Sequence, residues 1–217
     1  MFNLKKVNKE KIRLISEILF LIIFLVLFKQ KALQKWILIF GITLFISLVF
    51  NRLYCGWVCP METLFRPINW FYKKTGIKRI KTPDFFKNTW VRWSILIIFV
   101  LTMIVFKIFE IKINLLLYII ILSVMITLIF EEEMWHKHIC PYGTSLALFS
   151  RPAKYGLYIN EKKCISCGLC EKTCPVNTIF VQDNNKRYIY NKECLNCFKC
   201  QYVCPVDAID YGKLKQE

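Results

Sequence analysis

Acidic residues are scarce in this chain of 217 residues, which has 15 Asp and Glu against 31 Lys and Arg and a formal net charge of +16. At the same time, 56% of its residues are apolar or aromatic, which is not typical of a cytosolic enzyme. The chain lacks a basic recognition module, so its charge does not predict nucleic-acid binding. It also lacks an evident nucleophile or acid–base pair, and we do not expect it to be an enzyme by itself.

Apolar residues and cysteines occupy different parts of the chain. The long apolar runs lie before residue 131, and eight of the eleven cysteines lie after residue 163. No small-residue cleavage site follows the first run, which argues against a secretory signal peptide. We therefore predict an α-helical membrane domain over residues 1–150 and a small metal-bound domain over residues 151–217.

Four apolar runs predict four transmembrane helices, at about residues 12–28, 34–50, 91–108 and 111–130. Each is long enough to cross a bilayer, which takes about 17–25 residues, once the charged residues at its ends reach the interface. Four such runs leave no polar faces to meet water, which argues against core helices of a soluble domain. Glu17 lies near the start of the first helix, and we expect it to pair with Arg13 one turn away.

Lys and Arg are distributed unevenly among the predicted loops. Five precede Leu14 and eight lie in loop 51–89, whereas the other two loops have three and two. This asymmetry predicts that both termini and the cysteine-rich domain lie on the cytoplasmic side of the inner membrane. A basic edge against an anionic bilayer, at about 1 kcal/mol per well-placed cation, explains the net charge. In the long loop, aromatic residues next to lysines at 67–74 indicate either an interfacial segment or a solvated connection.

The C-terminal domain contains two copies of one cysteine motif, thirty residues apart. Each copy reads C-x₂-C-x₂-C-x₃-C-P, and seven of the sixteen aligned positions in 164–179 and 194–209 are identical. This spacing is the signature of bacterial ferredoxins with two [4Fe–4S] clusters, in which the fourth cysteine of each copy binds the other cluster. The predicted ligands are Cys164, Cys167, Cys170 and Cys204 for one cluster, and Cys194, Cys197, Cys200 and Cys174 for the other.

Zinc and disulfides fit this motif less well. Zinc sites normally use two C-x₂-C pairs, and disulfides are disfavoured in the cytosol.

Residues 179–190 predict a β-hairpin around an Asp-Asn-Asn turn. The domain is therefore expected to be a small α+β ferredoxin that depends on its clusters for folding, because so small a core needs additional cross-links.

Three further cysteines lie directly after the second and fourth predicted helices. Residues 55–60 read C-x₃-C-P, and residues 136–141 read H-x₃-C-P. On a helix, residues four apart share a face, where they could bind one metal. We hypothesise a third site, an iron–sulfur cluster or another metal, held by Cys55, Cys59, Cys140 and His136, with His138 out of register. A metal-free Cys55–Cys59 dithiol and inert thiols at helix ends remain alternatives.

Taken together, the spans, the two x-C-P motifs and the eight ferredoxin cysteines resemble the NapH/NosR family of polytopic membrane ferredoxins. The resemblance implies a membrane electron-transfer protein that links a quinone, flavin or cytoplasmic donor to a redox partner protein, such as a flavoprotein or a reductase subunit. His136 departs from the family pattern, which has cysteine there. Two other hypotheses stay open: a copper-like metal-ion reductase or cofactor-assembly factor using Cys55, Cys59 and Cys140, and a redox sensor or anchoring subunit whose clusters are structural.

Overall fold

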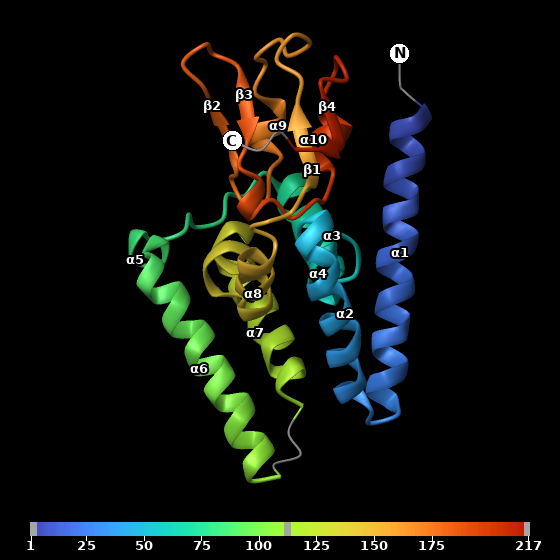
Figure 1. The fold of residues 1–217 in the computed structure, drawn as a ribbon, viewed down its shortest axis with the longest axis vertical. Helices are drawn as coiled ribbons and strands as arrows, with labels where there is room; N and C mark the ends of the chain where they lie inside the picture. Colours follow the sequence, from blue (N-terminus) through green and yellow to red (C-terminus); the bar gives the residue numbers. More distant parts are fainter. Residues whose placement is uncertain (1–3, 111–113, 215–217) are drawn as a thin grey trace.

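The computed structural model describes residues 4–110 and 114–214, and it consists of a long helical part and a small α+β part (Figure 1). Residues 111–113, at the start of the fourth predicted span, lie outside the described residues. The helical part contains α1 (Leu4–Lys29), a 3₁₀ turn (Leu33–Lys35), α2 (Trp36–Phe50), α3 (Leu53–Trp57), α4 (Pro60–Thr75), α5 (Asp84–Lys87), α6 (Thr89–Ile108), α7 (Leu115–Ile129), a π-helix (Met134–Ile139) and α8 (Pro141–Phe149).

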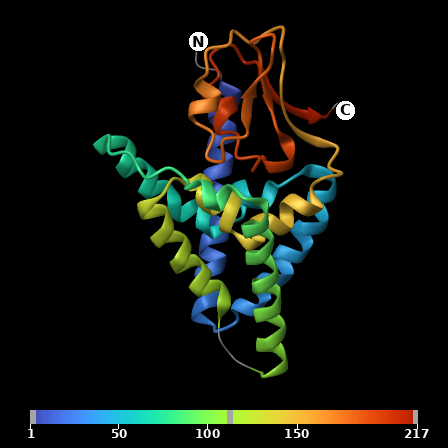
Figure 2. The same cartoon turned by 90° about the vertical axis from the view of Figure 1, so that its left-hand side faces the viewer.

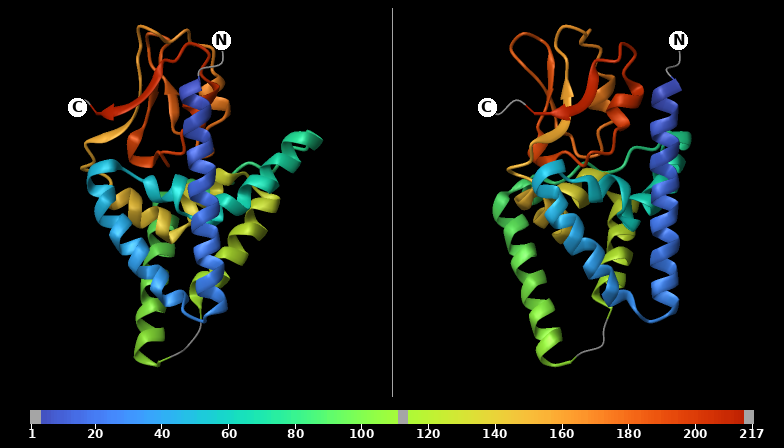
Figure 3. Two further views of the ribbon diagram at one scale, coloured as in Figure 1. Left: turned by 90° about the vertical axis from the view of Figure 1, so that its right-hand side faces the viewer. Right: turned by 45° about the vertical axis from the view of Figure 1, so that its right-hand side comes forward.

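The four predicted apolar segments are helical, as α1, α2, α6 and α7, and their far ends extend away from the α+β part (Figure 2). Among residues 4–110 and 114–214, two segments, Leu33–Phe50 and Thr89–Ile108, are long and apolar enough to cross a membrane. Helix α7 is equally apolar but has 15 residues. The N-terminal part of α1 runs upward beside the α+β part (Figure 3). The first helix of the chain is therefore in contact with the C-terminal domain.

Between the long helices and the α+β part lies a layer of shorter helices that the sequence did not predict. Helix α4 covers segment 67–74, and Pro67 lies inside it. Helices α4 and α8 begin in the same way, because Cys59 and Cys140 each have extended backbone and each precedes a proline in the first helical turn. Proline suits this position, since its missing N–H would be unpaired there in any case. The two x-C-P motifs are therefore helix starts rather than helix ends.

The α+β part is built from two antiparallel strand pairs. Strand β1 (Tyr155–Ile159) pairs with β4 (Ile209–Lys213), which brings the two ends of the domain together. Strand β2 (Ile179–Val181) pairs with β3 (Arg187–Ile189), which confirms the predicted hairpin. The remaining elements are α9 (Leu169–Lys172), a 3₁₀ turn (Asn191–Glu193) and α10 (Lys199–Val203). Each copy of the cysteine motif thus forms a loop, a one-turn helix, a Cys-Pro turn and a strand.

Candidate metal centres

The eight ferredoxin cysteines line two cavities in the α+β part. One cavity, which we call the distal cavity, is lined by Cys164, Cys167, Cys170 and Cys204. The other, the proximal cavity, is lined by Cys194, Cys197, Cys200 and Cys174. In each cavity the fourth cysteine comes from the other copy of the motif, as the ferredoxin signature requires. Four thiols and apolar neighbours are a donor set that suits an iron–sulfur cluster.

Among the described residues, no three Cys, His, Asp or Glu side chains are grouped as they would be around a single metal ion. A four-iron cube differs from a single ion because each thiolate binds its own iron corner.

Burial distinguishes the two cavities. The distal cavity reaches the surface, since Cys167 is exposed, and Ile165 and Leu169 beside it are 59% and 44% exposed. In the proximal cavity, burial raises the pKa of Cys194 to about 12 and that of Cys197 to about 11. Such thiols are protonated at neutral pH unless a cation binds them, and metal ligation supplies that cation.

The cysteine before each proline accepts a backbone N–H bond. The Sγ atom of Cys174 lies 3.5 Å from the nitrogen of Thr178, and that of Cys204 lies 3.3 Å from the nitrogen of Ala208. At the start of α8, the Sγ atom of Cys140 lies 3.3 Å from the nitrogen of Gly143. Hydrogen bonds to sulfur stabilise the thiolate and tune a bound cluster. Cys140 therefore shares a local geometry with two predicted cluster ligands.

The three remaining cysteines come together beneath the α+β part. Cys55, Cys59 and Cys140 are buried at 5%, 7% and 5% exposure. Burial raises the pKa of Cys59, and the nearby thiols of Cys55 and Cys140 raise it further. Burial and the Cys55 thiol raise the pKa of Cys140 to about 12. We call this group the edge site. The buried Arg52 guanidinium lies 4.0 Å from the Cys55 Sγ atom and favours its thiolate.

The helical register that motivated the third site is wrong. Helix α3 ends at Trp57, so Cys55 and Cys59 do not share a helix. His136 lies in a π-helix, where residues four apart no longer align. The thiols converge instead because α3 and the starts of α4 and α8 meet. The Nε2 atom of His136 lies 3.3 Å from an oxygen of the buried Glu62, and His138 lines a different cavity.

The edge site and the proximal cavity share one hydrophobic core. It contains Cys55, Cys59 and Cys140 from the edge site, and Val176, Leu195 and Cys197 from the α+β part. The two parts come close together at Gly56, where an added Cβ would lie 2.8 Å from the Leu195 carbonyl oxygen and 2.9 Å from the Cys197 Cα atom. Next to it, the Trp57 indole N–H donates to the Asn196 carbonyl at 3.1 Å. Loop 195–197 thus rests directly on the C-x₃-C-P motif.

Buried ion pairs bind the two parts on either side of this contact. The Arg52 guanidinium, fully buried, lies 3.1 Å from the carboxylate of Glu193, which Arg92 also binds at 2.6 Å. On the other side, the Lys199 ammonium lies 2.9 Å from Glu62. Burial opposes ionisation of Glu62, but Lys199 and His136 hold its pKa well below the usual range. Glu193 and Lys199, which directly precede Cys194 and Cys200, therefore form ion pairs with the helical part.

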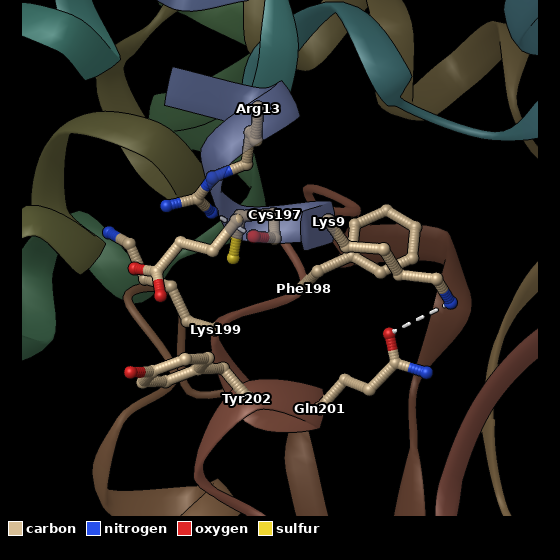
Figure 4. A pocket seen from close by; sticks show the side chains of 8 residues that line it. Lys9, Arg13, Cys197, Phe198, Lys199, Gln201 and Tyr202 are labelled. Carbon is tan, nitrogen blue, oxygen red and sulfur yellow. Dashed lines mark hydrogen bonds between the residues drawn. The ribbon is translucent and has the colours of Figure 1, made fainter. Parts of the chain in front are cut away.

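Helix α1 adds a third attachment (Figure 4). The Arg13 guanidinium reaches the carbonyl of Cys197, and the Lys9 ammonium points to the Gln201 side chain at 3.5 Å. The predicted Arg13–Glu17 pair is confirmed, with 3.4 Å between Nε and Oε1. Arg66 of α4 binds the same carboxylate. Glu17 is thus a structural ion-pair partner between helices.

Comparison with protein families supports this arrangement. A model of the 4Fe-4S dicluster domain matches residues 157–211. A model described as a 4Fe-4S binding domain matches twice, at residues 33–78 and 113–157. Among curated proteins, the ferredoxin-type protein NapH of Haemophilus influenzae is 23% identical over 150 residues, which is 62% of this chain and 51% of the relative. The chain is similar to NapH-type ferredoxin proteins and matches two 4Fe-4S family models.

Two other relatives extend the comparison. The methylamine utilization ferredoxin-type protein MauN of Paracoccus denitrificans is 27% identical over 152 residues, covering 64% of this chain and 54% of the relative. An uncharacterized protein of Methanocaldococcus jannaschii is 29% identical over 141 residues, covering 62% and 56%. The chain spans about half the length of these curated relatives. The two matches of the binding-domain model each include one x-C-P motif, so the helical part contains an internal repeat.

The sequence reasoning missed the charged residues that attach the two parts. Arg52, Glu62, Glu193 and Lys199 each lie within three residues of a predicted ligand, and Arg52 and Glu62 are almost fully buried. Charged residues so close to cysteines were a usable signal, because an ionised group beside a buried metal site needs a partner. The sequence could not predict which residues form these pairs, since 141 positions separate Arg52 from Glu193.

Proposed function

We propose that this chain is a membrane-bound iron–sulfur protein that carries electrons between a donor at the membrane and a redox partner protein. Iron–sulfur clusters supply one-electron transfer when bound. The two ferredoxin cavities and the family matches support the clusters. The observation that carries the proposal is that the edge site shares one core with the proximal cavity, whose cysteines share a second core with Cys170 of the distal cavity. The three groups of thiols are therefore neighbours in order from the edge site to the distal cavity.

The proposal assigns a third cluster to the edge site. Cys55, Cys59 and Cys140 would supply three ligands, and the family match to a 4Fe-4S binding domain over both x-C-P motifs supports this. His136 is the proposed fourth ligand. Its Nε2 atom lies 3.3 Å from a Glu62 oxygen, which supports this role because a metal-binding histidine usually has a carboxylate near its other ring nitrogen. Arg52 would offset the negative charge of the thiolates.

Membrane insertion is the second part of the proposal. We propose that α1, α2, α6 and α7 cross the inner membrane, with both termini and the ferredoxin domain in the cytoplasm. Helix α6 supports this because none of its residues is buried, although it is strongly apolar. The distribution of Lys and Arg supports the orientation. A reporter fused to the C-terminus should be active only in the cytoplasm, and activity outside the membrane would contradict this topology.

The surface around the distal cavity is the proposed docking site of the redox partner protein. Exposed Ile165 and Leu169 flank the exposed Cys167, so a partner protein could come close to a cluster there. A flavoprotein or a reductase subunit would use this surface. A quinone would instead approach the edge site from the membrane.

The test is a metal count on protein purified without oxygen. Three [4Fe–4S] clusters predict roughly twelve iron and twelve sulfide per chain, against about eight of each for the two ferredoxin clusters. Cys59→Ala should lower both counts to about eight and leave the two ferredoxin EPR signals intact. Met61→Leu, a conservative change at a buried neighbour, is the matched control and should keep twelve.

Other outcomes of this count are equally informative. A mononuclear metal at the edge site would leave sulfide near eight and add one metal ion. If wild-type protein holds eight iron and Cys59→Ala changes neither metal content nor cluster reduction, the edge site binds no metal and the proposal of a third centre is wrong.

A further inference from the structure

A cavity of about 320 Å³ lies at the junction of the helical part and the ferredoxin domain, apart from the cysteine-lined cavities. Its walls come from the start of α6, the π-helix, α8 and the loop that precedes Cys194. These elements meet just below the ferredoxin domain, on the side where α5 joins α6 (Figure 1). The volume is at the lower end of the range of small-molecule sites.

Cations dominate the walls of this cavity. The lining residues include five of them: Lys87, Arg92, Lys137, Arg151 and Lys192. Among the described lining residues the one carboxylate is Glu193, and two arginines already bind it. Lys87 and Lys137 have acidic partners on their own elements, at 2.8 Å and 3.0 Å.

Two of these cations have no acidic partner. Within residues 4–110 and 114–214, no ion pair involves the side chain of Arg151 or Lys192. Lys192 contacts the ring of Tyr190 instead, at 5.9 Å. The cavity therefore carries uncompensated positive charge, which attracts an anion.

Two kinds of hydrogen-bonding group face the same space. Asn88 and Thr89 line the cavity at the N-terminus of α6, a helix of 20 residues whose first backbone N–H groups and dipole favour an anion. His138 also lines it, is 7% exposed, and has an Nε2 atom without a hydrogen-bond partner in the described part of the chain. A buried polar atom without a partner is costly, and a ligand in the cavity would supply one.

We propose that this cavity binds a phosphate-type anion, with Arg151 and Lys192 as its main charged contacts and His138 and the start of α6 as hydrogen-bonding groups. Two sources share this chemistry, the headgroup of an anionic phospholipid and a soluble phosphate ester. Trp93 and Leu148 add apolar wall to the cavity, as the first part of an acyl chain would need. The bound anion would lie beside Glu193, one residue from Cys194.

The experiment uses the cluster-loaded full chain in nanodiscs. One preparation contains phosphatidylcholine alone, a second adds phosphatidylglycerol, and a third adds inorganic phosphate to phosphatidylcholine discs. Thermal unfolding and native mass spectrometry report binding. The test variant is Arg151→Gln/Lys192→Gln. The control, Lys73→Gln/Lys74→Gln, removes the same charge from the exposed end of α4, outside the cavity.

We expect phosphatidylglycerol or inorganic phosphate to raise the unfolding temperature of the wild type and of the control. The test variant should bind roughly 30-fold more weakly, since each of the two cations contributes about fivefold at a lipid surface. A response to phosphatidylglycerol alone identifies a lipid site, and a response to inorganic phosphate identifies a soluble ester. Equal responses of the test and control variants, or no response of the wild type, would overturn the proposal. Iron content measured in parallel shows that the clusters are intact.

Discussion

Gly56 offers a direct test of how the ferredoxin domain rests on the helical part. An alanine Cβ at this position would meet three backbone atoms, the nearest at 2.8 Å, 2.9 Å and 3.0 Å. Backbone cannot rotate away as a side chain can, so Gly56→Ala must displace loop 195–197. Forcing a methyl group into a packed interior costs about 1–3 kcal/mol.

Gly41 provides the matched control, because it is also a helical glycine and an added Cβ there would meet no atom within 4 Å. Both replacements gain about 0.5–1 kcal/mol from the better helix propensity of alanine. The difference between the two variants therefore isolates the packing cost, about 1–3 kcal/mol. For a chain of this size it corresponds to a gap in melting temperature of roughly 2–12 °C.

The assay is thermal unfolding of the cluster-loaded protein in one detergent, with hydrogen exchange of residues 191–200 as the local readout. We expect Gly56→Ala to melt below Gly41→Ala and to exchange faster in that segment. Equal melting temperatures and unchanged exchange would show that α3 and loop 195–197 are not in close contact, and the order of centres proposed above would lose its support.

Three further predictions follow from the same contacts. Glu193→Gln leaves the fully buried Arg52 without a carboxylate and should cost about 3–5 kcal/mol in thermal unfolding, whereas Asp84→Asn, at an exposed pair, should have no measurable effect. Cys174→Ala should remove the EPR signal of the cluster in the proximal cavity and keep the distal one; the opposite result would refute the crossed ligand assignment. Iron chelation should abolish exchange protection in β1 and β4 while α6 stays helical by circular dichroism, and protected strands in iron-free protein would contradict this.

Much of the fold could be predicted from the sequence, because the patterns that indicate it lie within short segments of the chain. The apolar runs predicted four helices, and the repeated cysteine spacing predicted which cysteines line each ferredoxin cavity. The short layer of helices was not readable. Segment 67–74 was expected to be an interfacial segment or a solvated connection, yet it belongs to α4, which continues through Pro67 and packs against α1 and α7.

The edge site was only partly predictable. The sequence grouped Cys55, Cys59 and Cys140, which share one buried core, but it did so from a helical register that is wrong. Cys59 begins a new helix, and His136 lies in a π-helix. Helix starts of this kind depend on the Cys-Pro pair. This pair is a local signal from which the starts of α4 and α8 could have been predicted. The contact of Gly56 with Leu195 could not have been predicted from the sequence. The two residues are 139 positions apart, and a periodic pattern of residues gives no information about contacts over that separation.

The attachment of the first helix to the last domain has a consequence for biogenesis. Arg13 contacts the carbonyl of Cys197, 184 residues further along the chain, and Asn51 contacts Asn191 across 140. The ribosome makes the helices first. The C-x₃-C-P motif is therefore not covered by loop 191–198 until that loop has been synthesised. The ferredoxin domain then completes the shared core, so the core around Cys55, Cys59 and Cys140 can be enclosed only after residues 191–198 have been made.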